Sequence, residues 1–309
     1  PRMNVDDVAR ELSSVRVLGA GRLGMAVSIL AEIFGDNKYL NILSLAGPLT
    51  AGGLRTVIHD LVSEGLVHAL VSSGANVTHD IIEALGWRHI AGSPTEDDAR
   101  LRKKRLGRIY DILIDQKAFE KLEKATHKML SEVDEERRTS FSTHELLWEI
   151  GRKLEDTGSI IRVAYEKKIP VFCPSIFDSM LGLSLWTFSQ LNKLIVNPLP
   201  DLTKLVDMTC EARRVGAVIL GGGVPKHFTL ASNILRGGVD AAIQITLDRP
   251  EGGSLSGAPL DEAVSWSKIR RKSRFVSVVG DATILFPIMV TGALQRVTKM
   301  RHKVQSTSR

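Results

Sequence analysis

The stretch AVILGGG at residues 217–223 places a short apolar run directly before three glycines. A run rich in β-branched and apolar residues is typical of a buried strand that ends in a loop. Similar runs alternate with amphipathic stretches from about residue 40 onward, and this alternation is typical of helices covering a parallel sheet. The candidate strands are 41–45, 67–72, 170–173, 194–197, 217–220, 241–246 and 275–279. The sequence therefore predicts an α/β fold with a doubly wound, mainly parallel, Rossmann-like sheet.

Two segments depart from this alternation. The first 40 residues carry apolar side chains at helical spacing, among them Val5, Val8 and Leu12, and are predicted to be helical. The charged segment 92–168 also shows helical spacing and offers only 109–114 as a strand. We therefore predict a single domain over residues 1–309, with an N-terminal helical segment of about 1–40 and a helical insertion of about 92–168.

The composition argues against several classes of protein. With 43% hydrophobic and 25% charged residues, the chain of 309 residues resembles an ordinary soluble globule. Cys173 and Cys210 form no CxxC pair, so neither a disulfide framework nor a metal site is expected. The longest apolar stretch, 275–294, contains Asp281 and Pro287, so no membrane span is expected. The N-terminus lacks the basic-then-apolar order of a signal peptide, which predicts a cytoplasmic protein.

The charge distribution gives only a weak indication of a nucleic-acid partner. Lys and Arg number 41 against 35 Asp and Glu, a formal net charge of +6. Basic residues gather between Arg100 and Arg108, but only Tyr110 adds an aromatic ring beside them. Proteins that bind single-stranded nucleic acid combine basic grooves with stacking rings. We expect a solvated surface and no direct nucleic-acid binding, with docking of an acidic protein or RNA as the alternative.

Glycines and small polar residues follow several predicted strands. Ligands of doubly wound sheets bind at the carboxyl ends of strands, where glycine allows a pyrophosphate to approach the backbone and an Asp can hold a ribose. Any one such loop is often a mere turn, but several on one edge predict a dinucleotide site. These stretches are AGPLTAGG (46–53), SSGAN (72–76), DS (178–179), GGG (221–223), GGSLSG (252–257) and GDA (280–282).

The stretch GAGRLG at 19–24 matches the dinucleotide fingerprint by its letters. The fingerprint needs a preceding strand and a carboxylate at the end of the next strand. Only 15–18 could form the preceding strand, and the next predicted strand ends in LAGP, at 45–48, without a carboxylate. A role other than NAD binding is therefore favoured for this stretch, with NAD contact as the alternative.

A second group of polar residues, DEAVSWSK at 261–268, follows the GGSLSG loop. A helix starting near Asp261 places Glu262 and Trp266 on one face, with Lys268 half a turn later. A lysine beside a tryptophan and a glycine-rich loop is a candidate for partial withdrawal from water, and its neutral amine can then attack an imine or carbonyl. The alternative is an ordinary solvated lysine at a helix end.

Three stretches closely resemble deoxyhypusine synthase: IPVFCP (169–174), LGGGVPKH (220–227) and EAVSWSKI (262–269). The similarity runs from about residue 40 to 295. It implies an NAD-dependent enzyme that transfers the aminobutyl group of spermidine, through an imine on an enzyme lysine, to a lysine of the translation initiation factor 5A precursor. It also implies a homotetramer whose active sites are shared across a dimer interface.

The resemblance assigns roles to individual residues. Lys268 is the expected nucleophile, and Glu262 is the best candidate to hold one ammonium end of the polyamine. The expected substrate-binding residues are His227, Glu262, Trp266, Gly253, Ser254 and His79. The expected NAD-binding residues are Thr50, Ala51, Ser73, Gly74, Ala75, Asp178, Gly222, Asp281 and Ala282.

Four positions depart from the pattern of eukaryotic members. Leu183, Leu255, Ala231 and His79 stand where those members carry an acidic residue, Asp, Asn and Glu respectively. The chain is more similar to the archaeal and bacterial branches, and the range of polyamines stays open. Two alternatives also stay open: a homospermidine-synthase-like enzyme that acts on putrescine, and a non-catalytic NAD-binding paralogue.

Overall fold

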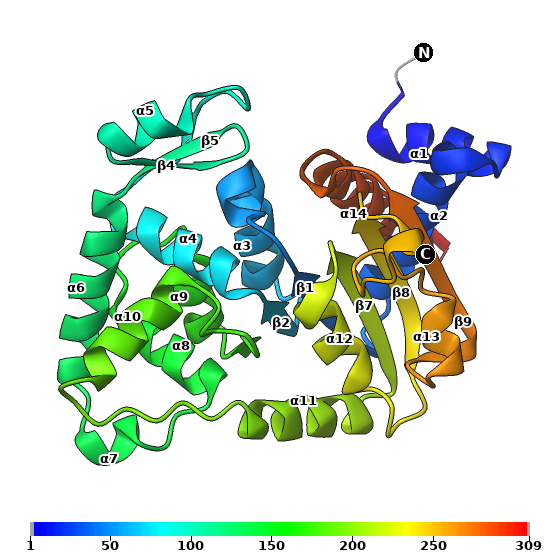
Figure 1. Ribbon diagram of the computed structural model, residues 1–309. Coiled ribbons are helices and arrows are strands. Elements are labelled where there is room, and N and C mark those ends of the chain that lie inside the picture. The colour runs from blue at the N-terminus through cyan, green and yellow to red at the C-terminus, as the bar shows by residue number, and fades with distance from the viewer. Residues whose placement is uncertain (1–2, 308–309) are drawn as a thin grey trace. The chain divides into compact units, whose positions relative to one another are not determined.

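Parallel strands form the main sheet of the protein (Figure 1). The computed structural model describes residues 3–307. The pairs β1 with β7, β7 with β8 and β8 with β9 are all parallel, which confirms the predicted α/β fold. In sheet order the strands are β6 (Val171–Phe172), β2 (Ala69–Ser72), β1 (Tyr39–Leu45), β7 (Arg214–Leu220), β8 (Val239–Thr246) and β9 (Ile269–Val279).

The chain divides into two compact units. The first holds the residues up to Ala46, Leu66–Val71, and the residues from Leu202 onward. The second holds Gly47–Gly65 and Ser72–Asp201. Each unit is described by itself below.

The central strands of the first unit are apolar and almost wholly buried. In β7 every residue after Arg214 is buried, and in β8 only Asp240 is half-buried. Strands of a parallel sheet are covered on both faces, so they lack the alternation of half-exposed strands. A Cβ atom on Gly216 of β7 would lie 2.9 Å from Ile33, so this glycine lets helix α2 (Leu18–Gly35) approach the sheet closely.

Helix α2 packs against α1 (Val5–Val15), α14 (Ala282–Thr307) and β9. The prediction of helices within the first 40 residues is confirmed for the described part; residues 1 and 2 lie outside it. By length and composition α2 is also the one helix within residues 3–307 that could cross a membrane. However, Val27, Ile29 and Leu30 are fully buried. This burial, together with the packing of α2 against α1, α14 and β9, is typical of a core helix.

The GAGRLG stretch lies in the first two turns of α2, and no strand precedes it among the described residues. A Cβ atom at Gly24 would lie 2.4 Å from Ser13 N, and one at Gly21 would lie 2.7 Å from the carbonyl carbon of Arg16. No atom lies within 4 Å of a Cβ built at Gly19. Two of the glycines therefore allow close packing of α1 on α2. This packing accounts for the glycines of the stretch, and nucleotide binding is not needed to explain them.

The second unit combines helices with a small antiparallel sheet of β3 (Ile90–Ala91), β5 (Ile112–Asp115) and β4 (Leu106–Ile109). The helical content predicted for 92–168 is confirmed, but the single strand predicted at 109–114 is wrong. Tyr110 has φ 55° and lies in the turn that reverses the chain between β4 and β5. The helices of the second unit are α3 (Arg55–Ser63), α4 (Gly74–Ala84), α5 (Asp98–Lys103), α6 (Lys117–Ser131), α7 (Glu135–Arg138), α8 (Thr143–Lys153), α9 (Ile160–Glu166) and α10 (Met180–Ser189).

The strand predicted at 194–197 is also wrong. Val196 forms only an isolated bridge with Phe141, and the amides of Ile195 and Asn197 donate to carbonyls of residues 138 and 141. The run is short and stops before Pro198, and Ile195 is 56% exposed. Its apolar letters therefore do not mark a core strand.

A buried carboxylate holds the second unit together. Asp80 of α4 accepts hydrogen bonds from the Ser159 hydroxyl (2.7 Å) and from the amides of Ile160 and Ile161 at the start of α9. Arg55 Nε lies 2.7 Å from the same carboxylate. Negative charge is favourable at a helix N-terminus, so Asp80 joins α3, α4 and α9.

Candidate functional site

A buried lysine follows the triple glycine in the first unit. Lys226, in the first turns of α12 (Gly223–Ala231), is 4% exposed. Its Nζ donates to Gln244 Oε1 (3.0 Å), to the Leu255 carbonyl (2.9 Å) and to the Ala258 carbonyl. Burial lowers the pKa of Lys226 to about 8, and the charge of Lys268 acts in the same direction while Glu262 opposes it. Lys226 thereby anchors the loop after β8.

Gln244 of β8 also holds the loop after β8 in place. Its Nε2 donates to the carbonyls of Gly221 (3.0 Å) and Ser256 (2.9 Å). A Cβ atom on Gly222 would lie 2.3 Å from the Cα of Ser256. Only glycine permits this approach, so the triple glycine and the GGSLSG loop are packed backbone to backbone. Sequence reasoning assigned no role to Gln244, because a buried glutamine inside a strand has no spacing signature.

The predicted nucleophile lies directly before β9. Lys268 is half-buried, and its Nζ stands 5.5 Å from the centroid of the Trp266 ring, a cation–π distance. Hydrogen bonds from the Lys268 amide to Ala263 and from Val239 to the Lys268 carbonyl fix the backbone. The prediction that Lys268 lies beside Trp266 is confirmed.

The helix expected to align Glu262 with Trp266 is a single turn. Helix α13 covers Glu262–Ser265, and Ser267 takes a left-handed φ of 57°. The prediction of one helical face carrying both side chains is therefore wrong, because the chain leaves the helix before Trp266. Both side chains are exposed, so their polar and aromatic surfaces are open to a ligand.

Electrostatic coupling places four ionisable groups in one cluster of the first unit. Withdrawal from water and the charge of Lys268 lower the pKa of His227, which follows Lys226 on α12. Lys226 is affected by both Glu262 and Lys268. His227, Glu262 and Lys268, which the sequence predicts as site residues, are thus brought together. Gly253 and Ser254 lie exposed on the loop that Lys226 anchors.

Two helices of the first unit begin just after strands. Helix α12 starts after β7, and its preceding residue is Gly222. Helix α14 starts after β9, where Asp281 Oδ1 accepts hydrogen bonds from the amide and hydroxyl of Thr283, each at 2.8 Å. Ala282 is buried beside it. Helix N-termini bind phosphate groups through their free amides, so the start of α12 at Gly222 suits a phosphate. At α14 the Asp281 carboxylate already caps the Thr283 amide, and this carboxylate suits a ribose hydroxyl instead.

The second unit brings together another set of predicted NAD residues. The amide and hydroxyl of Thr50 donate to Asn76 Oδ1 at 3.0 and 3.1 Å, and Asn76 Nδ2 donates to Ser73 Oγ at 3.1 Å. The Ser73 hydroxyl donates to the Gly47 carbonyl. Thr50 is buried, whereas Ala51 and Ala75 are half-buried. Asn76, which was not among the predicted site residues, holds the two loops together.

Helices α4 and α10 of the second unit also begin at predicted NAD residues. A Cβ atom on Gly74, the first residue of α4, would lie 2.6 Å from the Cβ of Ser179. Ser179 caps α10 by accepting from the Gly182 amide at 3.0 Å. Asp178 precedes it, with an exposed side chain. A glycine and a free carboxylate beside helix N-termini are groups that suit phosphate and ribose.

His79 lies within α4 and is 6% exposed. His89 Nε2 lies 2.9 Å from His79 Nδ1, and His89 Nδ1 lies 2.7 Å from Glu83 Oε1. Burial, together with the neighbouring His89, lowers the pKa of His79 to about 4, so its ring is neutral at neutral pH. Residues 3–307 contain no group of three His, Cys, Asp or Glu side chains placed to hold a metal.

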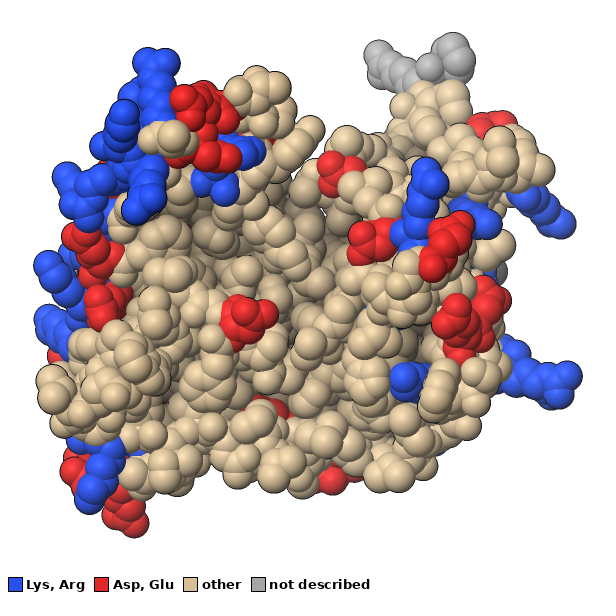
Figure 2. Space-filling model, in the orientation of Figure 1, with Lys and Arg blue, Asp and Glu red and all other residues tan. Residues whose placement is uncertain are grey.

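The basic cluster between Arg100 and Arg108 forms a surface of the second unit, around α5 (Figure 2). Arg108 Nη2 pairs with Asp98 at 2.7 Å, and Arg105 pairs with Glu120. The other members, Arg100, Arg102, Lys103 and Lys104, are exposed. These positions agree with the solvated surface predicted for the cluster.

Comparison with known proteins gives consistent matches over nearly the whole chain. A family model for deoxyhypusine synthase matches residues 7–293. A protein of Methanothermobacter thermautotrophicus named "Probable deoxyhypusine synthase" is 45% identical over 295 residues, which cover 96% of this chain and 95% of that protein. A protein of Methanopyrus kandleri with the same name is 42% identical, with the same coverage of both chains. The crystal structure of a proposed deoxyhypusine synthase from Entamoeba histolytica shares the fold, with a TM-score of 0.68 at 21% identity, covering 94% of this chain and 93% of that one.

Proposed function

Because the chain belongs to the deoxyhypusine synthase family and is therefore an aminobutyltransferase, we propose that it uses NAD and spermidine to modify a lysine of the translation initiation factor 5A precursor. The observation that carries this proposal is the position of Lys268. Lys268 is half-buried beside Trp266, and its charge contributes to lowering the pKa of His227 and of Lys226.

The residues that would hold NAD lie at helix N-termini. In the first unit these are Gly222, Asp281 and Ala282, and in the second unit Thr50, Ala51, Ser73, Gly74, Ala75 and Asp178. Bound NAD supplies a hydride acceptor for the first half of the reaction and a hydride donor for the second. A Cβ atom on Gly222 would meet the Cα of Ser256, and one on Gly74 would meet the side chain of Ser179, so neither position has room for a side chain.

The polyamine would bind through charge and aromatic contact. The exposed carboxylate of Glu262 can pair with one ammonium group, and the exposed ring of Trp266 can add a cation–π contact of about 0.5 to 2 kcal/mol. His227 feels the charge of Lys268, and Gly253 and Ser254 are exposed on the loop that Lys226 anchors; we propose that all three contact the polyamine. His79, the remaining predicted substrate-binding residue, lies in the second unit and has a neutral ring at neutral pH, because its pKa is lowered to about 4.

Lys268 would carry the aminobutyl group between donor and acceptor. Its neutral amine adds to the carbon of the oxidised C=N bond, a C–N bond to the leaving amine breaks, and 1,3-diaminopropane departs with the proton given up by Lys268. The acceptor lysine then displaces Lys268 in the same way. The Trp266 ring lies beside the amine, with its centroid 5.5 Å from Lys268 Nζ.

One experiment tests the donor, the cofactor and the acceptor together. The purified enzyme is incubated with NAD, radiolabelled spermidine and either the factor 5A precursor or putrescine. Label on the protein acceptor that depends on NAD supports the proposal. Label that appears only in homospermidine, or transfer that persists without NAD, contradicts it. The Lys268→Arg variant under the same conditions serves as the control for chemistry at this amine.

The proposal extends to assembly and location. The family resemblance supports a homotetramer, and a translation factor as acceptor supports a cytoplasmic enzyme. Light scattering of the purified protein and fractionation of the source cells test these two points. A monomer that is fully active at dilution contradicts the first, and enzyme found only outside the cytoplasm contradicts the second.

A further inference from the structure

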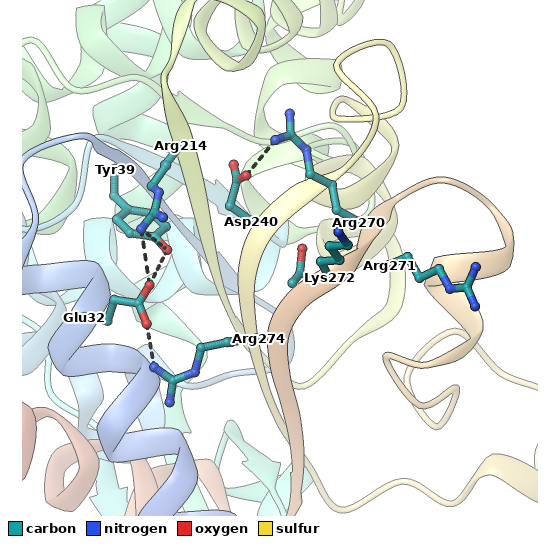
Figure 3. Close-up of a pocket in the computed structure, with 9 residues that line it drawn as sticks. Glu32, Tyr39, Arg214, Asp240, Arg270, Arg271, Lys272 and Arg274 are labelled. Atoms are coloured by element: carbon teal, nitrogen blue, oxygen red, sulfur yellow. Dashed lines mark hydrogen bonds and ion pairs between the residues drawn. The ribbon is translucent and has the colours of Figure 1, made fainter.

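A cavity of about 520 Å³ lies in the first unit, and none of its lining residues was assigned to the reaction (Figure 3). Its basic wall begins close to the proposed nucleophile, since Arg270 follows Lys268 by two positions. The cavity forms at the amino ends of the strands, since Tyr39 begins β1, Arg214 begins β7 and Asp240 is the second residue of β8. The glycine loops of the candidate site follow the carboxyl ends of these strands. The lining residues are Glu32, Tyr39, Arg214, Asp240, Arg270, Arg271, Lys272, Ser273 and Arg274.

The cavity owes its basic wall to an irregularity in β9. Val239 pairs with Ile269 and Ala241 pairs with Arg274, so residues 270–273 of β9 stand opposite Asp240 alone. The extra residues leave the ladder and bulge outward. They are RRKS in the sequence, so the bulge carries three consecutive positive charges.

The two acidic side chains of the lining are already occupied by neighbours. Glu32 accepts from the Tyr39 hydroxyl (2.8 Å), from Arg274 (2.6 Å) and from Arg214 (3.4 Å). Burial and this contact with Glu32 raise the pKa of Tyr39, so the phenol keeps its proton and continues to donate. Glu32 therefore orients two guanidinium groups at the cavity wall and offsets only part of their positive charge.

Asp240 orients a third guanidinium. It accepts from Arg270 Nη1 at 2.8 Å, from Arg236 Nη1 at 2.9 Å and from the Val215 amide at 2.8 Å. Neither Arg271 nor Lys272 forms an ion pair within residues 3–307, and both are exposed. Figure 3 shows Arg271 pointing away from the other labelled side chains. The lining therefore holds five basic residues against two carboxylates, and Arg271 is the one of the five that points away.

We propose that this cavity binds the di- or triphosphate group of a small anion. Guanidinium groups present planar pairs of N–H donors that match phosphate oxygens, and here Arg214, Arg270 and Arg274 are held in place before any ligand arrives. Lys272 adds an ammonium without a protein partner. The volume lies within the range of small-molecule sites and exceeds the need of a single phosphate.

The lining disfavours RNA as the ligand. Proteins that bind single strands stack bases on exposed aromatic rings. Tyr39 is the one aromatic residue among those that line the cavity; it is 4% exposed, and the Arg214 guanidinium lies 5.3 Å from its ring centroid. Recognition is therefore confined to phosphate groups, and a nucleobase gains no stacking partner.

The test is calorimetric titration of the full-length protein with inorganic pyrophosphate in the presence of saturating NAD, so that the nucleotide site is filled. Lys272→Gln removes a charge that has no protein partner. Arg270→Gln leaves Asp240 bonded to Arg236 and Val215. Each substitution is expected to weaken pyrophosphate binding about tenfold, and raising the salt from 50 to 200 mM is expected to weaken it further. Arg102→Gln, at an exposed site of the second unit, is the matched control and is expected to have no effect.

Three results would overturn the proposal. The first is that pyrophosphate does not bind at millimolar concentration. The second is that Arg102→Gln weakens pyrophosphate binding as much as Lys272→Gln does. The third is that a single-stranded RNA oligomer binds in a manner that depends on Lys272 and is not displaced by pyrophosphate. The calorimetric titration measures pyrophosphate binding and does not depend on aminobutyl transfer. A protein that binds pyrophosphate through Lys272 but shows no NAD-dependent transfer would contradict the proposed function and leave this proposal standing.

Discussion

The amine of Lys226 lies 3.0 Å from Gln244 Oε1, while Gln244 Nε2 donates to the carbonyls of Gly221 and Ser256. The side chains of these two residues therefore join α12, β8 and two glycine-containing loops through one buried contact. Their amide and amine groups supply the donors that the loop carbonyls need.

Lys226→Met is expected to lower the free energy of unfolding by about 3 kcal/mol, because it leaves buried acceptors without a donor. Urea unfolding followed by circular dichroism measures this change. Lys124→Met, at an exposed position of α6, is the control and should stay within about 0.5 kcal/mol of the parent. Equal stability of the two variants would contradict the anchoring role.

Lys268→Arg is expected to reduce aminobutyl transfer about a thousandfold or more, because arginine stays protonated and cannot act as the amine nucleophile. Equilibrium dialysis with NAD should show unchanged affinity. Lys103→Arg, at an exposed position of α5, should retain full activity. Undiminished transfer by Lys268→Arg would rule out this amine as the carrier.

His79 gives the stability of the protein a predictable dependence on pH. Its folded-state pKa of about 4 lies below the ordinary value of 6.5, so the unfolded chain takes up a proton first as the pH falls. The free energy of unfolding should decrease between pH 6.5 and 4, by about 2 kcal/mol at pH 5 relative to pH 7.

Urea midpoints measured across this range at constant protein concentration test the effect. His79→Gln should show a shallower decrease, while His302→Gln, at an exposed position, should follow the parent. A parallel decrease in the parent and in His79→Gln would show that other groups cause it.

The glycines of the GAGRLG stretch offer a matched pair of substitutions. Gly24→Ala should destabilise the protein by about 3 kcal/mol, because its Cβ meets the α1 backbone at 2.4 Å. Gly19→Ala meets no atom within 4 Å and should be neutral or slightly stabilising, since alanine favours helix. Thermal unfolding compares the two. Loss of NAD affinity in Gly19→Ala at unchanged stability would instead restore the nucleotide interpretation of this stretch.

The sequence predicted the strands best where apolar residues run without interruption. The cores of β7 and β8 were found at 217–220 and 241–246, but the charged beginning of β9 was missed because Arg270–Lys272 carry no strand signal. The run at 194–197 shows the opposite error, since apolar letters alone do not reveal exposure.

Site residues close in sequence were predictable, and distant partners were not. Lys268 and Trp266 lie two positions apart, so their contact follows from local geometry. The pairing of His79 with His89 depends on how the chain returns after α4, and that of Lys226 with Gln244 depends on how α12 packs against β8. No spacing rule encodes these contacts, because tertiary packing creates them.

The bulge in β9 also bears on how copies of the chain behave at high concentration. β9 is the last strand in the sheet order, and an unprotected outermost strand can recruit another chain through its unpaired backbone groups. Here the outer strand is interrupted by Arg270, Arg271 and Lys272. An approaching strand would lose its ladder at that point and, if it were a second copy of β9, would meet like charges. The irregularity therefore guards the sheet against open-ended aggregation.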